Sequence, residues 1–436
     1  MQRLIKFSDH HHFLTAMKDR YSCFDSNKKN ILLIEPYGST LAFMQRGIEN
    51  QFNIILLTAN KDLRQVPLHY IEAVAMAIEV ETANEIQLMA LVKCMQILFP
   101  LHAVIPGFEY FVPIALRLSR YLNLPNADAV NVMSLRRKDL MRSHLQANNV
   151  LVPNFRFVNA MSELETALTE IGYPAICKPV DSAGSVNVKQ VTNYQEASVA
   201  ASRILQGRDI LWGHKLSNRV LVEEYIDGKE YSLEGVVHNQ RVIHFSITEK
   251  WVSDQFEFVE IGHIVNPPIE CHLKKRMEKY IEKVIEILGI NYCPFHAEIR
   301  LNKDTQPVLM EIASRLAGDR IGELIYHATG VNYYDYCYAA YLNEDLPFPV
   351  LDSFTHAGIR FFYRPLIDAY THVTGVEKVK AFPVEDFSLY YSANQAIPVF
   401  PKALRRLGHV IIKSADYLGL AQMLDEIDHC IKFVSY

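Results

Sequence analysis

HAEIRLNKDTQPVLMEIASR, residues 296–315, contains two runs in which apolar and polar residues alternate, joined by the polar segment 302–307. Alternation of this kind is typical of β-strands, and the segment rich in Asn, Asp and Lys between them predicts the turn of an antiparallel hairpin. A turn centred after Asp304 makes three apolar pairs face one another: Ala297 with Ile312, Ile299 with Met310, and Leu301 with Val308. All three pairs lie on one side of the sheet, which supports this register.

The same register places two carboxylates, Glu298 and Glu311, directly opposite each other on the other side. Side chains paired in this way start about 5 Å apart, and two charges at that distance repel by about 3 kcal/mol at an effective dielectric constant of 20. A shared proton, a neighbouring cation such as Arg300 or Arg315, or a divalent metal ion would relieve the repulsion. The hairpin alone leaves open a solvated face on which the two arginines pair with the glutamates.

Length and charge limit the class of protein. A chain of 436 residues, half of them hydrophobic, predicts two to four domains with large buried cores. The net charge of −5 and the isoelectric point near 6.4 supply no basic surface for a nucleic acid or an anionic membrane. We expect neither as a partner.

The cysteines and the N-terminal segment indicate where the protein works. Seven cysteines without a CxxC pair are typical of reduced thiols in a cytosolic protein. The first residues contain no long apolar run, and no stretch of 18 apolar residues occurs in the chain. We therefore expect a cytoplasmic protein.

Strands and helices alternate through about residue 127. Buried strands are predicted at 29–35, 52–60 and 102–107, each followed by a helix or by another alternating segment, which favours an open parallel sheet. No GxGxxG motif occurs, so a dinucleotide site is not predicted. Glu109 follows the third of these strands, at the edge where such sheets bind ligands, and is equally compatible with a carboxylate that begins a helix.

The remaining chain predicts a mixture of helices and mostly antiparallel strands. Residues 219–248 are expected to form consecutive antiparallel strands, residues 273–290 a helix, and residues after 350 strands with one late helix. The expected fold class is α/β and α+β. The expected domains are 1–127, 128–219, 220–349 and 350–436.

Several segments suit an anionic ligand. No Walker A sequence is present. Lys178 instead ends an apolar strand before the loop DSAGSVN, 181–187, in which Ser182, Gly184 and Ser185 allow backbone amides to face an anion. Lys138 and Arg142 are four residues apart, on one face of a predicted helix. Taken singly, these features also fit an ordinary turn and an ordinary charged helix.

The segment VEEYIDGKE, 222–230, suits a strand that runs along an adenine ring. Its Glu224–Ile226 backbone is placed to pair with the base edge, and Glu230 to accept hydrogen bonds from a ribose. A charged β-turn remains an alternative for this segment taken alone.

The order and spacing of these pieces resemble the ATP-grasp superfamily, and within it the L-amino-acid ligases of the bacilysin-synthetase type. The resemblance covers essentially the whole chain. It implies an ATP-grasp fold: an N-terminal open parallel sheet domain, two α+β subdomains that sandwich ATP, and a C-terminal α+β cap. It also implies the following site: Lys138 and Lys178 on the nucleotide, Ser182, Gly184 and Ser185 in the phosphate loop, Glu223 toward the adenine amino group, Glu224, Tyr225, Ile226 and Met310 around the base, Glu230 on the ribose, Glu298 and Glu311 as magnesium ligands, and Arg315 on the transferred phosphate.

Two local features refine the resemblance. The usual ending Glu-Ile-Asn-Pro-Arg is Glu-Ile-Ala-Ser-Arg here, so Ala313 replaces an asparagine that ligates a second magnesium ion, and the number of metal ions is left open. The segment FEFVEIGHIVNPP resembles the Glu-x-Gly-His-x-x-Pro segment of the dipeptide ligases. This likeness implies that Glu260 and His263 line the amino-acid pocket.

The resemblance implies an ADP-forming carboxylate–amine ligase that uses ATP with Mg²⁺, or Mn²⁺, and proceeds through an acyl phosphate. The expected partners are a small-molecule carboxylate and amine, both amino acids, and a second copy of the chain in a homodimer. Three alternatives stay open: a ligase for another carboxylate, a carboxylase-type enzyme, and an ATP-binding regulatory protein without turnover.

Overall fold

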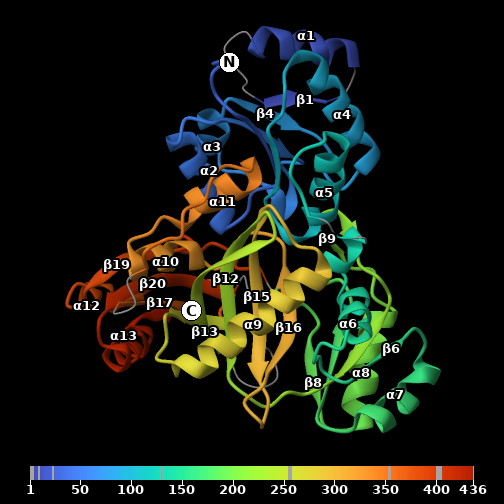
Figure 1. The fold of residues 1–436 in the computed structure, drawn as a ribbon. Coiled ribbons are helices and arrows are strands. Elements are labelled where there is room, and N and C mark those ends of the chain that lie inside the picture. Colours follow the sequence, from blue (N-terminus) through green and yellow to red (C-terminus); the bar gives the residue numbers. More distant parts are fainter. Residues whose placement is uncertain are drawn as a thin grey trace.

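The computed structural model describes residues 4–7, 10–21, 24–127, 129, 131–253, 258–351, 355–398 and 405–435. Three larger sheets organise this part of the chain (Figure 1). A five-stranded sheet contains the N-terminal strands, and a four-stranded sheet is formed by strands from the middle of the chain. An eight-stranded sheet contains the remaining strands, apart from two short two-stranded sheets.

The N-terminal sheet is parallel throughout, as expected. Its strand order is β1-β4-β3-β2-β5. Side chains alternate along β2, so that Ile31 and Leu33 enter one core while Leu32 and Ile34 enter another. Both faces are therefore covered, which is why these strands are continuous apolar runs. The elements are β1 (Leu4–Lys6), α1 (His10–Tyr21), β2 (Asn30–Ile34), α2 (Ser39–Glu49), β3 (Asn53–Thr58), η1 (Asp62–Arg64), α3 (Leu68–Ala73), β4 (Met76–Glu79), α4 (Glu85–Leu98), β5 (Ala103–Pro106), η2 (Glu109–Phe111) and α5 (Val112–Tyr121).

The four-stranded sheet has the order β6-β11-β7-β8 and is antiparallel, with α7 and α8 packed against it. The strand β11 belongs to this sheet rather than to a run of consecutive strands with β12, so that part of the sequence expectation is wrong. The elements are η3 (Val132–Leu135), α6 (Lys138–Ala147), β6 (Phe155–Val158), η4 (Met161–Glu163), α7 (Leu164–Ile171), β7 (Ala175–Pro179), β8 (Lys189–Val191), α8 (Tyr194–Leu205), β9 (Ile210–Leu211), β10 (His214–Lys215) and β11 (Val220–Glu224).

The eight-stranded sheet has the order β16-β15-β12-β13-β14-β17-β20-β19. Its last three strands come from the C-terminal part, so the expected cap continues the same sheet through the β14–β17 pairing. The elements are β12 (Glu230–His238), β13 (Arg241–Val252), β14 (Glu260–Val265), α9 (Cys271–Leu288), β15 (Cys293–Leu301), β16 (Pro307–Ala313), α10 (Ile321–Thr329), α11 (Tyr333–Leu342), β17 (His356–Tyr363), β18 (His372–Thr374), α12 (Val376–Val379), β19 (Val384–Leu389), β20 (Arg406–Ser414), α13 (Tyr417–Cys430) and β21 (Lys432–Val434).

The hairpin of β15 and β16 forms with Glu298 opposite Glu311 and Ala297 opposite Ile312, as predicted. Beyond Glu298 the predicted register is wrong, because a β-bulge at Met310 shifts the pairing by one residue. Ile299 therefore faces Leu309, and Leu301 faces Pro307. The bulge leaves the two carboxylates opposed and bends the strand beside them.

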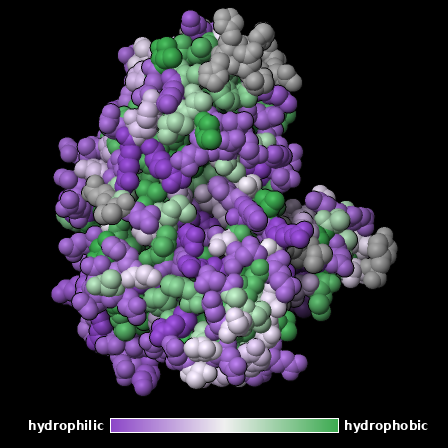
Figure 2. Space-filling view, turned by 90° about the vertical axis from the view of Figure 1, so that its right-hand side faces the viewer, coloured by the Kyte–Doolittle hydropathy of each residue, from purple (hydrophilic) through white to green (hydrophobic). Residues whose placement is uncertain are grey.

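The face shown in Figure 2 is largely polar, and the described cysteines are unpaired. Hydrophilic residues cover most of the face in Figure 2, with hydrophobic residues in small groups between them. Within the described ranges no helix is both long and apolar enough to span a membrane. Six cysteines lie in the described part and carry free thiols, while Cys23 lies outside it.

Candidate active site

The two opposed glutamates of the hairpin each contact a lysine from another element. Lys138, at the start of α6, places its Nζ 3.0 Å from Glu311 Oε1. Lys250, on β13, places its Nζ 2.5 Å from Glu298 Oε1. Burial would raise the pKa of Glu298, but Lys250 and His296 overcome this effect and hold it well below its usual range. Two lysines therefore offset the repulsion between the glutamates.

The arginines suggested by the sequence have other partners. Arg300 pairs with Glu230 at 2.9 Å, and Arg315 pairs with Glu109 at 2.7 Å. Of the alternatives left open by the sequence, pairing of these two arginines with Glu298 and Glu311 is not observed. Glu109 is almost fully buried and begins η2 at the carboxyl edge of the parallel sheet, so its pairing joins that sheet to the residue that follows β16.

A buried ion-pair cluster lies where the small sheet meets α6. Glu223 of β11 receives Lys178 Nζ at 2.5 Å and Arg142 Nε at 2.7 Å. Burial would raise the pKa of Glu223, but Arg142 and Lys178 lower it to about 2. Arg142 also donates to the carbonyl oxygen of Met310 at 2.7 Å, which connects the cluster to the bulge of the hairpin.

The segment between β11 and β12 runs along the end of β15. A Cβ atom on Gly228 would lie 1.8 Å from the carbonyl oxygen of Leu301, so only glycine fits at this position. The carboxylate of Glu224 accepts hydrogen bonds from Asn154, and Arg300 donates to Glu230 and to the carbonyl oxygen of Ile226. The guanidinium of Arg300 also lies 5.5 Å from the ring centre of Tyr225.

The glycine loop lies beside Lys138. Its Nζ donates to the carbonyl oxygen of Ser182 at 2.7 Å, and the Ser182 hydroxyl donates to the carbonyl oxygen of Val186 at 3.0 Å. Gly184 and Ser185 both have positive φ angles, of 64° and 54°, which turn the backbone sharply at an exposed glycine. The loop is thus close to Lys138 and through it to Glu311.

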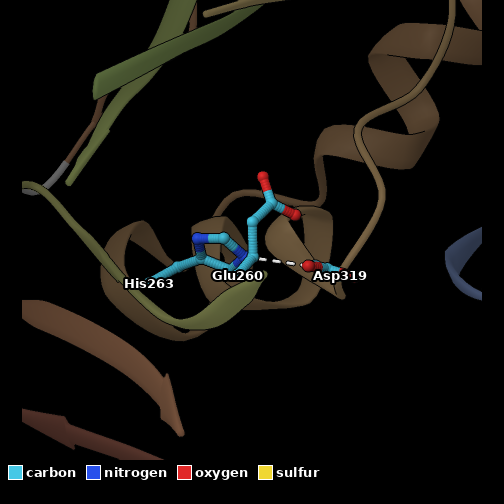
Figure 3. Close-up of side chains that lie close together, drawn as sticks. All are labelled: Glu260, His263 and Asp319. Carbon is cyan, nitrogen blue, oxygen red and sulfur yellow. Dashed lines mark hydrogen bonds and ion pairs between the residues drawn. The ribbon is translucent and has the colours of Figure 1, made fainter. Parts of the chain in front are cut away.

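A second cluster of ionisable side chains contains Glu260, His263 and Asp319. Ligating atoms of Glu260, His263 and Asp319 lie within 4.8 Å of one another, and His263 Nε2 is 3.1 Å from Asp319 Oδ2 (Figure 3). These residue types suit a metal ion. Each carboxylate already has a cation, however, because Lys250 contacts Glu260 and Arg406 binds Asp319 through two hydrogen bonds of 2.7 and 3.0 Å. We therefore interpret the cluster as an ion-pair network.

His296 links the deeper carboxylates. Its ring nitrogens lie 3.0 Å from Glu234 and 3.2 Å from Glu298. Burial would lower its pKa, but the two carboxylates raise it to about 9.

Sequence reasoning missed Lys250, Asp319 and Arg406. Lys250 had a weak signal, because Ser246, Thr248 and Lys250 are spaced two residues apart on β13, and all three are buried in the structure. Residues at this spacing lie on one face of a strand, so the three polar side chains share a face. Asp319 and Arg406 are brought together across 87 positions of the chain and carry no such local pattern.

Comparisons with known proteins indicate which family the chain resembles. A family model described as an ATP-grasp domain matches residues 171–323. This segment of the chain is therefore similar to the ATP-grasp domain family. The matched range includes Lys178, the glycine loop and both hairpin glutamates.

Two relatives match longer stretches of the chain than the family model does. The uncharacterized protein y4rH of Sinorhizobium fredii is 26% identical over 314 residues, which are 72% of this chain and 64% of that protein. Alanine–anticapsin ligase of Bacillus subtilis is 26% identical over 236 residues, which are 51% of this chain and 50% of that protein. The chain thus spans less than two thirds of the length of either relative. The resemblance to the L-amino-acid-ligase branch is confirmed at this level.

The ATP-grasp fold itself extends over nearly the whole chain. The structure of an L-amino acid ligase from Bacillus licheniformis superposes with a TM-score of 0.77 at 20% identity, covering 94% of this chain and 99% of that one. The expected fold class is therefore confirmed.

Proposed function

We propose that this protein is an ATP-dependent, ADP-forming ligase that joins the carboxylate of one L-amino acid to the amine of another. The observation that carries the proposal is the opposition of Glu298 and Glu311 on a bulged hairpin, with Lys138 and Lys250 on their carboxylates. Two carboxylates held against lysines suit a Mg²⁺–nucleotide, which brings both a cation for the glutamates and phosphates for the lysines.

The donor set fits a magnesium or manganese ion. Both glutamates offer oxygen atoms and keep about a quarter of their side-chain surface exposed (23% and 26%), unlike the fully buried carboxylate of Glu234. Glu298 and Glu311 would hold the ion, and the ion would neutralise charge on the β- and γ-phosphates. Ala313, buried opposite His296, offers no third ligand, so further ligands would come from phosphates and water.

We assign the remaining roles by position. Lys138, Lys178, the amides of Ser182–Ser185 and Arg315 orient the phosphates, and the hinge Glu223–Ile226 with Tyr225, Met310 and Glu230 holds the adenosine. A substrate carboxylate attacks the γ-phosphate and forms an acyl phosphate, and the second substrate's amine then displaces phosphate. Glu260 and His263, joined by Asp319, face the amino-acid substrates.

The proposal extends to the chain as a whole. We keep the division into domains 1–127, 128–219, 220–349 and 350–436, a cytoplasmic location and a homodimer as parts of it. In this division β11 pairs with strands of the second domain, and β17 continues the sheet of the third. Size-exclusion chromatography with light scattering tests the dimer.

Phosphate release and product mass test the function. The protein is incubated with Mg²⁺–ATP and pairs of amino acids, alongside Glu311→Ala and the matched control Glu165→Ala, an exposed glutamate on α7. Phosphate release that requires two amino acids, yields a dipeptide mass, and disappears only in Glu311→Ala supports the proposal. Release with another carboxylate shifts the substrate class, and ATP binding without any turnover supports a regulatory protein.

A further inference from the structure

The connection between α8 and β11 leaves the small sheet and reaches the N-terminal region. It carries the short hairpin β9–β10, which lies close to the lower end of α5 in Figure 1. Trp212, at the turn of this hairpin, is 8% exposed. Its ring centre lies 4.6 Å from that of Tyr37 and 4.3 Å from that of Phe108, both of which follow strands of the parallel sheet.

The neighbouring hairpin residues fit equally closely. The His214 ring contacts Tyr110 and Phe111, at centre distances of 5.6 and 5.4 Å. Gly213 has a φ of +79°, and a Cβ atom there would lie 2.8 Å from Arg64 Nη1. Leu211, Trp212 and Leu216 share one apolar core with residues of α4 and α5. The hairpin is therefore part of the N-terminal region's core, although the chain around it belongs to the small sheet.

The same connection holds both ends of the glycine loop. At the first end, the backbone amide of Ser217 donates to the Asp181 carboxylate at 3.0 and 3.2 Å. At the other end, Asn187 Nδ2 donates to Asp209 Oδ2 at 3.1 Å. Between the two ends, the buried side chain of Val186 joins the same core as Trp212. Because of these contacts, we expect the glycine loop and the β9–β10 hairpin to move together.

Tyr37 and Phe108 lie next to the site as well. The guanidinium of Arg315 is 6.0 Å from the ring centre of Phe108. The charges of Arg406 and Asp319 both act on the Tyr37 hydroxyl, whose pKa is raised mainly by burial. The aromatic group that receives Trp212 therefore adjoins the residues assigned to the transferred phosphate and the amino acids.

We propose that Trp212 is a positioning residue, which docks on Tyr37 and Phe108 and thereby holds the glycine loop 181–187 closed beside Lys138. The inference rests on the proposed function and adds to it the means by which the N-terminal region controls loop closure. A closed loop excludes water from the acyl phosphate. When the loop opens, water attacks in place of the amine. Water forms a new bond to the carbonyl carbon, the bond between that carbon and the bridging oxygen breaks, and the carboxylate, phosphate and one proton are released without an amide.

The ratio of phosphate to amide tests this proposal in the working enzyme. Wild-type protein is expected to release one phosphate per amide. Trp212→Ala is expected to release an excess and to raise the KM for ATP about tenfold, because a misplaced loop loses its contacts with the phosphates. Trp212→Phe should restore coupling, and Trp251→Ala, which removes the chain's other tryptophan from β13, should keep the ratio at one. An unchanged ratio and KM in Trp212→Ala would overturn the proposal.

A binding experiment separates this inference from the function itself. In a Trp251→Phe background Trp212 is the only tryptophan, and its acrylamide quenching reports docking. Adding Tyr37→Ala, at a residue that is 37% exposed and so tolerates truncation, is expected to increase quenching and to weaken Mg²⁺–ATP binding about tenfold. Increased quenching with unchanged ATP affinity would refute coupling of the hairpin to the loop. This readout holds even if no amino-acid pair supports turnover, which would refute only the ligase function.

Discussion

Two regions of the molecule bury a glutamate, and they do so in opposite ways. Glu35, directly after β2, receives hydrogen bonds from the hydroxyls of Thr58 and Thr82 and the amide of Ala59, at 2.8, 2.5 and 2.6 Å. Burial dominates there and raises the pKa of Glu35 to about 7. Glu223 is buried as deeply, but Arg142 and Lys178 lower its pKa to about 2.

The difference shows how partners decide the role of a buried carboxyl group. Neutral donors leave Glu35 able to take up a proton, so it acts as a hydrogen-bonded packing group. Paired cations keep Glu223 charged at any physiological pH, and Glu223 in turn supplies the counter-charge that these buried cations require. The candidate site is built from carboxylates that are paired with cations, as Glu223 is. A Mg²⁺–nucleotide could replace these pairings, with the metal ion on the carboxylates and the phosphates on the lysines.

The largest effect on the free energy of unfolding is expected when the buried ion-pair cluster around Glu223 is disrupted. Glu223→Gln leaves Lys178 and Arg142 buried without a counter-charge, which should cost about 3–5 kcal/mol of unfolding free energy. Urea unfolding followed by circular dichroism measures it, with Glu165→Gln as the exposed control. A loss below about 1 kcal/mol would mean that the two cations find other partners.

The next effect concerns Glu35 and depends on pH. Because its folded pKa of about 7 exceeds the ordinary 4.5, its contribution to stability is complete below 4.5 and is lost as the pH rises through 7. Glu35→Gln cannot ionise, so between about pH 5 and pH 8 it should gain about 3 kcal/mol relative to wild type. Urea midpoints at the two pH values measure the gain. Parallel pH profiles for the two proteins would contradict the assigned cause.

A smaller effect is expected if Lys250 occupies the position that a metal ion takes beside Glu298. Lys250→Met removes the ammonium group from Glu298, so Mn²⁺ should bind without nucleotide about tenfold more tightly, equivalent to about 1.4 kcal/mol. Titration calorimetry measures the affinity, and Lys279→Met on α9 serves as the control. Unchanged or weaker binding would show that Lys250 does not compete for the metal position.

The smallest effect is expected at the surface. Arg117 pairs with Glu85 through two hydrogen bonds, but their side chains are 35% and 46% exposed. Arg117→Ala should therefore change the unfolding free energy by about 1 kcal/mol or less, because water screens the pair. A larger loss in the same urea experiment would weaken the contrast between buried and exposed pairs.

Local patterns were enough to predict much of this fold. The parallel sheet follows from apolar strands such as β2 alternating with helices, and the opposition of Glu298 and Glu311 follows from the alternation in their hairpin. The bulge at Met310 was not predicted, because alternation assumes an unbroken period of two.

Contacts between distant segments were not predictable in this way. Arg315 pairs with Glu109 across 206 positions, and Trp212 docks on Tyr37 and Phe108 from a different sheet. Each of these side chains has an ordinary local explanation, and only the folded chain determines its partner. The continuation of the large sheet into β17 likewise depends on strand pairing that one sequence does not specify.

That continuous sheet also determines where its unprotected edges lie. Since β17 pairs with β14, a chain that ended near residue 350 would leave the outer side of β14, with Ile264 and Val265, as an unpaired apolar edge. Such edges promote aggregation by recruiting strands from other molecules. In the intact chain the edge is β19 instead, a short strand that carries Glu385 and Asp386. The C-terminal segment thus protects the protein against self-association through its sheet.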